Sequence, residues 1–134
     1  MPESLLKQCD SILDSLKHGK EVKDVSPSLY TLFRPSIQPF LISWFKYDPA
    51  EIISKLTIPA LIIEGTTDIQ VSVEQAEILS KACKNSKLVI IKDMNHILKN
   101  VPTLNRMKNT ASYSNPDLPL SAELCRSIVR FIKS

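Results

Sequence analysis

The segment from Pro59 to His96 constrains the fold of this 134-residue chain more than any other part of the sequence. It contains two short apolar runs, Ala60 to Ile63 and Lys87 to Lys92, of the kind found in strands that are covered on both faces. Between them, the segment from Val73 to about Cys83 has the periodicity of an amphipathic helix. A strand, a helix and a parallel strand form a βαβ unit, whose crossover is right-handed in nearly all known proteins. The sequence therefore predicts an α/β fold built on a short parallel sheet.

Further helical patterns lie on both sides of this unit. Apolar residues between Glu3 and His18 recur on one helical face, and Gly19 follows where a helix would end in a left-handed cap. A short helix from about Gln38 to Phe45 is apolar on all sides, so we expect it in the core or, alternatively, as a lid over a hydrophobic cleft. A C-terminal helix is predicted from Ala122 to Lys133. Its buried side would contain Leu124, Ile128, Phe131 and Ile132.

Two of these helices, and a further short helix predicted to start at Pro49, are preceded by residues that favour helix starts. Asp48 precedes Pro49, Ser72 lies three residues before Gln75 as in a capping box, and Ser121 precedes the C-terminal helix. We expect these side chains to accept hydrogen bonds from the free amides of the first helical turn.

The segment from about Lys99 to Leu120 shows no clear periodicity and contains Pro102, Pro116 and Pro119. A structureless connection of this length is uncommon inside a compact domain and is usually functional, mobile or both. We predict a long loop here.

Composition argues against several classes of function. Gly19 and Gly65 are the two glycines of the chain, so the sequence contains no GxGxxG turn, no P-loop and no GxSxG elbow. The net charge is +3 with scattered basic residues, which makes nucleic acid an unexpected partner. The three cysteines are far apart and form no CxxC pair, so we expect free thiols and no metal site or cofactor. No apolar run approaches the roughly 20 residues that span a bilayer.

The compartment of the protein stays open at this stage. Unpaired cysteines and an amphipathic start that contains acids, unlike a secretory signal, favour the cytoplasm. A longer parent protein would be free to carry a signal peptide.

Two chemically useful residues follow the ends of the two predicted strands. Asp68 lies three residues after Gly65, and His96 lies four residues after Lys92. Loops at the carboxyl ends of parallel strands share one edge of a sheet, where ligands bind. There, a carboxylate can orient an imidazole and stabilise the imidazolium that forms when it takes a proton from a nucleophile. Taken singly, each residue is more often structural, so the spacing alone leaves that possibility open.

The span from Tyr47 to His96, with PALIIEGTTDIQVS and KDMNH, resembles the C-terminal half of an α/β-hydrolase. Two further stretches, LFRPSIQPFLISWFKYDPAEI from Leu32 and SYSNPDLPLSAEL from Ser112, resemble bacterial members of the esterase and lysophospholipase-like group. The family has the chain order nucleophile, acid, histidine. The resemblance implies that Asp68 is the triad acid and His96 the general base. It also implies that residues 1–46 form a helical cap and residues 47–134 the C-terminal part of the hydrolase core.

The earlier strands, the oxyanion-hole loop and the nucleophile elbow of that family have no counterpart in this sequence. We therefore expect a portion of a serine hydrolase that acts on small-molecule esters or acyl groups when complete and is inactive alone. Because the strand at Ala60 would have an open edge, we also expect dimers or larger homo-oligomers to form through it. Two alternatives remain: a non-catalytic association module derived from this fold, and a small complete enzyme in which Ser72 or a cysteine acts with His96.

Overall fold

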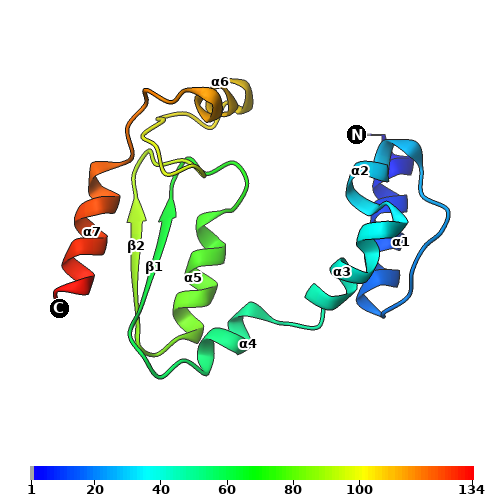
Figure 1. Cartoon of the computed structure of the whole chain (residues 1–134), viewed down its shortest axis with the longest axis horizontal. Coiled ribbons are helices and arrows are strands. Elements are labelled where there is room, and N and C mark those ends of the chain that lie inside the picture. The colour runs from blue at the N-terminus through cyan, green and yellow to red at the C-terminus, as the bar shows by residue number, and fades with distance from the viewer. Residues whose placement is uncertain (1) are drawn as a thin grey trace. The chain divides into compact units, whose positions relative to one another are not determined.

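The computed structural model describes residues 2–134 and divides them into two compact units, one ending at Asp48 and the other running from Pro49 to Ser134 (Figure 1). The sequence predicts a boundary between residues 46 and 47. The roles of cap and hydrolase core that it assigns to the two sides remain predictions. Each unit has its own cluster of buried apolar side chains and is described by itself.

In the first unit, α1 (Glu3–Lys17) packs its apolar face into a small core and ends as the sequence predicts. Gly19 has a φ of +74°, and its amide donates to the carbonyl of Leu16. The amide of Lys20 donates to the carbonyl of Ser15, which completes a Schellman cap. The core consists of Ile12, Leu16, Val25, Leu29 and Phe33.

Two short helices follow, α2 (Tyr30–Phe33) and α3 (Gln38–Trp44). A buried glutamine at the start of α3 connects the end of α2 with the loop that follows α1. Gln38 is fully buried; its Oε1 accepts from the amide of Val22, and its Nε2 donates to the carbonyls of Val22 and Phe33. Every polar atom of this side chain is therefore paired, as burial of an amide requires.

The expectation that α3 lies in the core is wrong for its aromatic residues. Phe40 is 55% exposed and Trp44 62% exposed, and their ring centroids lie 4.7 Å apart. The residues that pack against the core are Leu41 and Ile42. A helix of seven residues has room for one buried face, and the core of this unit is too small to cover the other.

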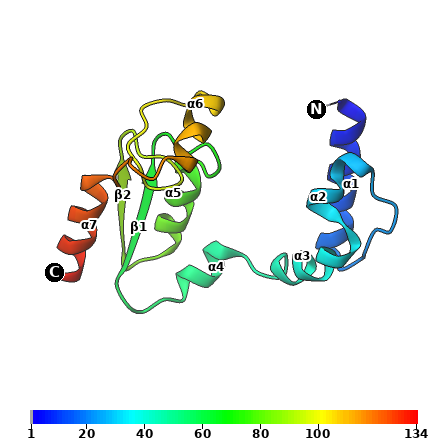
Figure 2. The same cartoon turned by 45° about the horizontal axis from the view of Figure 1, so that its top comes forward.

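In the second unit, the predicted parallel βαβ arrangement is confirmed. After α4 (Pro49–Ser54), strand β1 (Ala60–Gly65) pairs in parallel with β2 (Ser86–Ile91), and α5 (Val73–Ala82) connects them. The helix α7 (Ala122–Ile132) lies on the other side of the sheet from α5, as both views show (Figures 1 and 2). The result is a mixed α/β unit with three layers.

The two strands are less buried than their apolar sequences predict. Of their residues, Gly65 and Ile91 are buried and most of the others are half-buried. The predicted buried side of α7 is only partly covered, since Leu124 is 6% exposed but Ile132 is 76% exposed. Two strands offer too narrow a surface to cover an 11-residue helix along its whole length.

Two of the predicted helix caps are also wrong. Ser72 and Ser121 occupy N-cap positions, but neither side chain makes the capping hydrogen bond. Instead, the hydroxyl of Ser72 pairs with the carboxylate of Glu74, which lowers the pKa of that carboxyl. Ser121 is held by its backbone amide, which donates to the carbonyl of Leu98.

The segment predicted as a long loop contains the helix α6 (Arg106–Ala111) and a 3₁₀ turn, Ser112–Ser114. Asn105 caps α6, since its Oδ1 accepts from the amide of Lys108 at 3.1 Å. The buried residue of α6 is Asn109. A helix whose inward residue is polar gives no apolar periodicity, so the sequence pattern missed it.

No helix within residues 2–134 combines the length and the apolar character needed to cross a membrane.

Candidate active site

The structure brings Asp68 and His96 together at the carboxyl ends of the two parallel strands. Nδ1 of His96 lies 2.8 Å from Oδ2 of Asp68, although 28 positions separate them in the sequence. Helix α6 lies at this end of the sheet in both views (Figure 2). The acid and the base therefore meet across this edge of the sheet, as the sequence predicts.

The Asp68 carboxylate is held on both oxygens. Oδ1 accepts from the amides of Gln70 and Val71, at 2.7 and 2.9 Å, and Oδ2 faces His96. Burial acts to raise the pKa of Asp68, but the hydrogen bonds from Val71, Gln70 and His96 outweigh it and hold that pKa below its ordinary value. Asp68 is therefore a carboxylate at neutral pH.

The imidazole of His96 is more accessible than its partner. Its side chain is 39% exposed, whereas that of Asp68 is 5% exposed. Since a carboxylate only accepts, Nδ1 must carry the proton of this hydrogen bond, and in the neutral ring Nε2 is then the basic nitrogen. The pair can therefore act as an oriented base.

The two loops that carry these residues are tied by backbone contacts. Thr67 donates its amide to the carbonyl of Met94 at 3.1 Å, and Thr66 Oγ1 accepts from the amide of Asp93 at 2.8 Å. Gly65 is required at this approach, because a Cβ there would lie 2.0 Å from the carbonyl oxygen of Met94. The glycine thus permits the approach of the loop that leads to His96.

His96 itself begins a three-residue hairpin loop, followed by Ile97 and Leu98. The amide of Leu98 donates to the carbonyl of Asn95 at 2.8 Å, and the amide of Asn95 donates to the carbonyl of Lys99 at 3.0 Å. Leu98 has a φ of +65°, in the left-handed position that such loops usually give to glycine. A leucine there is strained.

A second acid, Glu64, lies beside Asp68 and was not singled out from the sequence. Its Oε1 accepts from the amide of Gly65 at 2.8 Å. Burial raises the pKa of Glu64; the Gly65 amide acts to lower it, but the neighbouring Asp68 carboxylate raises it further. The signal available in the sequence was the one charged residue in the otherwise apolar strand β1.

The structure also contains a buried polar cluster that sequence reasoning missed, formed by Asn95, Asn109 and Ser112. Their exposed fractions are 1%, 0% and 8%. The signal in the sequence was the asparagine directly before His96; the other two residues lie in a segment read as loop.

Within residues 2–134, no group of three or more His, Cys, Asp or Glu side chains is arranged to hold a metal ion. Cys9, Cys83 and Cys125 are free thiols.

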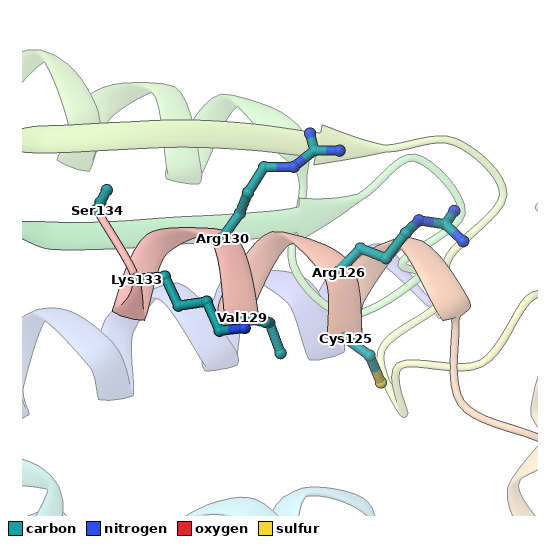
Figure 3. A pocket seen from close by; sticks show the side chains of 6 residues that line it. All are labelled: Cys125, Arg126, Val129, Arg130, Lys133 and Ser134. Carbon is teal, nitrogen blue, oxygen red and sulfur yellow. The ribbon is translucent and has the colours of Figure 1, made fainter.

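A hollow of about 600 Å³ lies elsewhere, along the outer side of α7 (Figure 3). Figure 3 shows Cys125 and Val129 on one side of the helix and the chains of Arg126 and Arg130 extending to the other. All the residues that line it belong to α7 and the two residues after it. The hollow is therefore a feature of the surface of one helix, and neither Asp68 nor His96 lines it.

A comparison with curated proteins finds similarity to Esterase EstD of Thermotoga maritima, 33% identical over 91 residues. The aligned stretch covers 66% of this chain and 21% of the esterase, so the chain spans about a fifth of the length of that relative. No family model and no solved structure matches the chain. The chain is thus related in part to an esterase, and its mixed α/β structure with a two-stranded parallel sheet is consistent with a partial α/β fold.

Proposed function

We propose that this chain supplies the acid and the histidine, Asp68 and His96, of a serine hydrolase that cleaves carboxylic esters or acyl groups. The observation that carries the proposal is the 2.8 Å hydrogen bond between His96 Nδ1 and Asp68 Oδ2 at the carboxyl ends of adjacent parallel strands. The partial similarity to a bacterial esterase supports the same class. The complete enzyme would be of the esterase and lysophospholipase-like group, with residues 1–46 as its cap.

In that enzyme the neutral His96 would act first as a base. Nε2 would take the proton of a serine hydroxyl while Nδ1–H stays hydrogen-bonded to Asp68, whose charge stabilises the imidazolium. The imidazolium would then return the proton to the leaving alcohol. The sequence contains no GxSxG elbow, so the nucleophile would come from outside it, and we expect the chain alone to be inactive.

The open edge of β1 supports the expected association. The amides of Ala60 and Thr66 donate to carbonyls of the β2 side, Asn85 and Ile91. Because strand amides point alternately to the two edges, the amides of Leu61 and Ile63 face away from β2. We propose that a strand of the complete enzyme pairs there and that, in the isolated chain, a second copy does so.

The test is hydrolysis of p-nitrophenyl butyrate by this chain, alone and joined to the polypeptide encoded directly upstream of it. We expect turnover from the joined protein only, reduced at least about 10³-fold by His96→Ala and by Asp68→Asn. The matched control is His18→Ala, since His18 Nδ1 lies 3.6 Å from Oδ1 of Asp14 in a second histidine–carboxylate pair, at the C-terminal end of α1. Turnover that survives His96→Ala would exclude the proposed role.

The second candidate is a non-catalytic association module, favoured by the exposed apolar side chains of α3 and α7. Trp44 is 62% exposed and Ile132 76% exposed, which is typical of surfaces that pack against a partner. This candidate requires that His96→Ala and Asp68→Asn leave self-association unchanged and that no joined protein hydrolyses the ester.

A further inference from the structure

Helix α6 reaches the two site loops through the side chain of Asn109. Its Nδ2 donates to the carbonyl of Thr67, the residue before Asp68, and to the carbonyl of Thr103, both at 2.8 Å. Its Oδ1 accepts from Nδ2 of Asn95, the residue before His96, at 3.3 Å. One amide group therefore connects the residue that precedes the acid with the residue that precedes the base.

The other two members of the cluster complete this connection. Asn95 Nδ2 also donates to Ser112 Oγ at 2.8 Å, and Asn95 Oδ1 accepts from the amide of Lys99 at 3.1 Å. Ser112 Oγ in turn donates to the carbonyl of Asn109 at 2.7 Å. Each polar atom of the two amide side chains thus has a hydrogen-bond partner, so the loss of one member would leave buried groups of the others unpaired.

This hydrogen-bond network fixes the backbone of the residue before Asp68. Thr67 is fixed at both ends, because its amide donates to Met94 and its carbonyl accepts from Asn109. The peptide that enters Asp68 cannot rotate without breaking a buried hydrogen bond. The orientation of Asp68 toward His96 therefore depends on α6 as well as on the strands.

We propose that Asn109 is a positioning residue for the Asp68–His96 pair, and this inference rests on the proposed function only in that the pair is the site. Asn109 does not touch the reacting atoms. It acts by fixing the Thr67 carbonyl and the Asn95 side chain in one arrangement, and its loss frees His96 to leave the Asp68 carboxylate.

The test is the tautomer of His96 in the ¹⁵N-labelled full chain, read from two-bond ¹H–¹⁵N correlations of the neutral imidazole. We expect the wild type to show the Nδ1–H form, as Asp68 requires. In Asn109→Ala the Nδ1 and Nε2 shifts should move toward each other as both tautomers become populated, while the backbone shifts of β1 and β2 stay unchanged. Asp68→Asn gives the reference for a lost partner.

The matched control is Asn105→Ala, which removes the exposed cap of α6 and leaves the cluster intact. It should keep the wild-type tautomer, and a change as large as in Asn109→Ala would overturn the assignment to Asn109. If Asn109→Ala does not fold, Asn109→Ser replaces it, because the shorter side chain with a single hydroxyl cannot bond both the Thr67 carbonyl and Asn95 Nδ2. An unchanged tautomer in a folded variant of Asn109 overturns the proposal. A wild type without the Nδ1–H form would contradict the Asp68–His96 pairing itself and so the proposed function, which is a distinct failure.

Discussion

At the scale of single residues, two acids at one end of β1 have opposite pKa shifts. The pKa of Asp68 lies below its ordinary value and that of Glu64 above it. Burial acts to raise the pKa of both carboxyls. For Asp68 the hydrogen bonds from two amides and His96 outweigh it, whereas Glu64 accepts from one amide and faces a like charge, so its pKa stays raised. The two residues therefore make opposite contributions to stability as the pH changes.

We predict that Glu64→Gln and Asp68→Asn change the pH dependence of unfolding in opposite directions. A raised folded-state pKa costs stability once the pH rises above the unfolded value, about 4.3 for glutamate. The free energy of unfolding of Glu64→Gln should therefore increase relative to that of the wild type between pH 4 and 7. A lowered folded-state pKa adds stability above about 3.9, so the deficit of Asp68→Asn should be present at pH 7 and shrink as the pH falls through the folded pKa. Urea unfolding between pH 3 and 7 measures both, and parallel curves would contradict the prediction.

Leu98 provides a second prediction at this scale. Its left-handed backbone is costly for leucine and less so for asparagine, and the residue is 42% exposed, so little burial would be lost. We expect Leu98→Asn to raise the free energy of unfolding by about 0.5–1 kcal/mol. The control Leu104→Asn, at a 66% exposed loop residue without a positive φ, should stay within about 0.5 kcal/mol of the wild type. Equal effects of the two changes on the free energy of unfolding would show that backbone strain at Leu98 is not the cause.

At the scale of elements, the pattern of apolar residues predicted the strands and helices that have an apolar side. Strands β1 and β2 and the helices α1, α5 and α7 were located to within a few residues from periodicity, and the Asp68–His96 meeting followed from the parallel topology. Helix α6 could not be found in this way, because its inward residue is Asn109 and its partners lie up to 42 positions away. Ser72 shows a related limit, since its hydroxyl takes a neighbouring carboxylate in place of the helix amides.

The contact between the end of β1 and the His96 loop leads to a prediction for Gly65. Gly65→Ala would place a methyl group against the backbone of Met94, which cannot move without separating the two loops. We expect a loss of about 2–3 kcal/mol in urea unfolding. Gly19→Ala is the control, because its left-handed φ costs about 1 kcal/mol but no atom lies within 4 Å of the added Cβ. A smaller loss at Gly65 than at Gly19 would contradict the close approach.

At the scale of the whole molecule, the sheet has two strands and exposes backbone donors on the free edge of β1. The isolated chain should therefore associate at micromolar concentrations in multi-angle light scattering. Leu61→Pro removes one outward-facing amide and should shift the population toward monomers, while Ile62→Pro, whose amide faces β2, should instead destabilise the sheet. A wild type that stays monomeric would argue against pairing through this edge.

The close approach at Gly65 also bears on how this sequence tolerates variation. In a library of single substitutions selected for cellular abundance, we expect position 65 to accept almost no other residue, while position 96 accepts many, since the His96 ring is partly exposed and its loop is held by its backbone. Under selection for hydrolysis by the complete enzyme, both positions should become intolerant. Comparison of the two selections would separate the residues that build this end of the sheet from those that perform the chemistry on it.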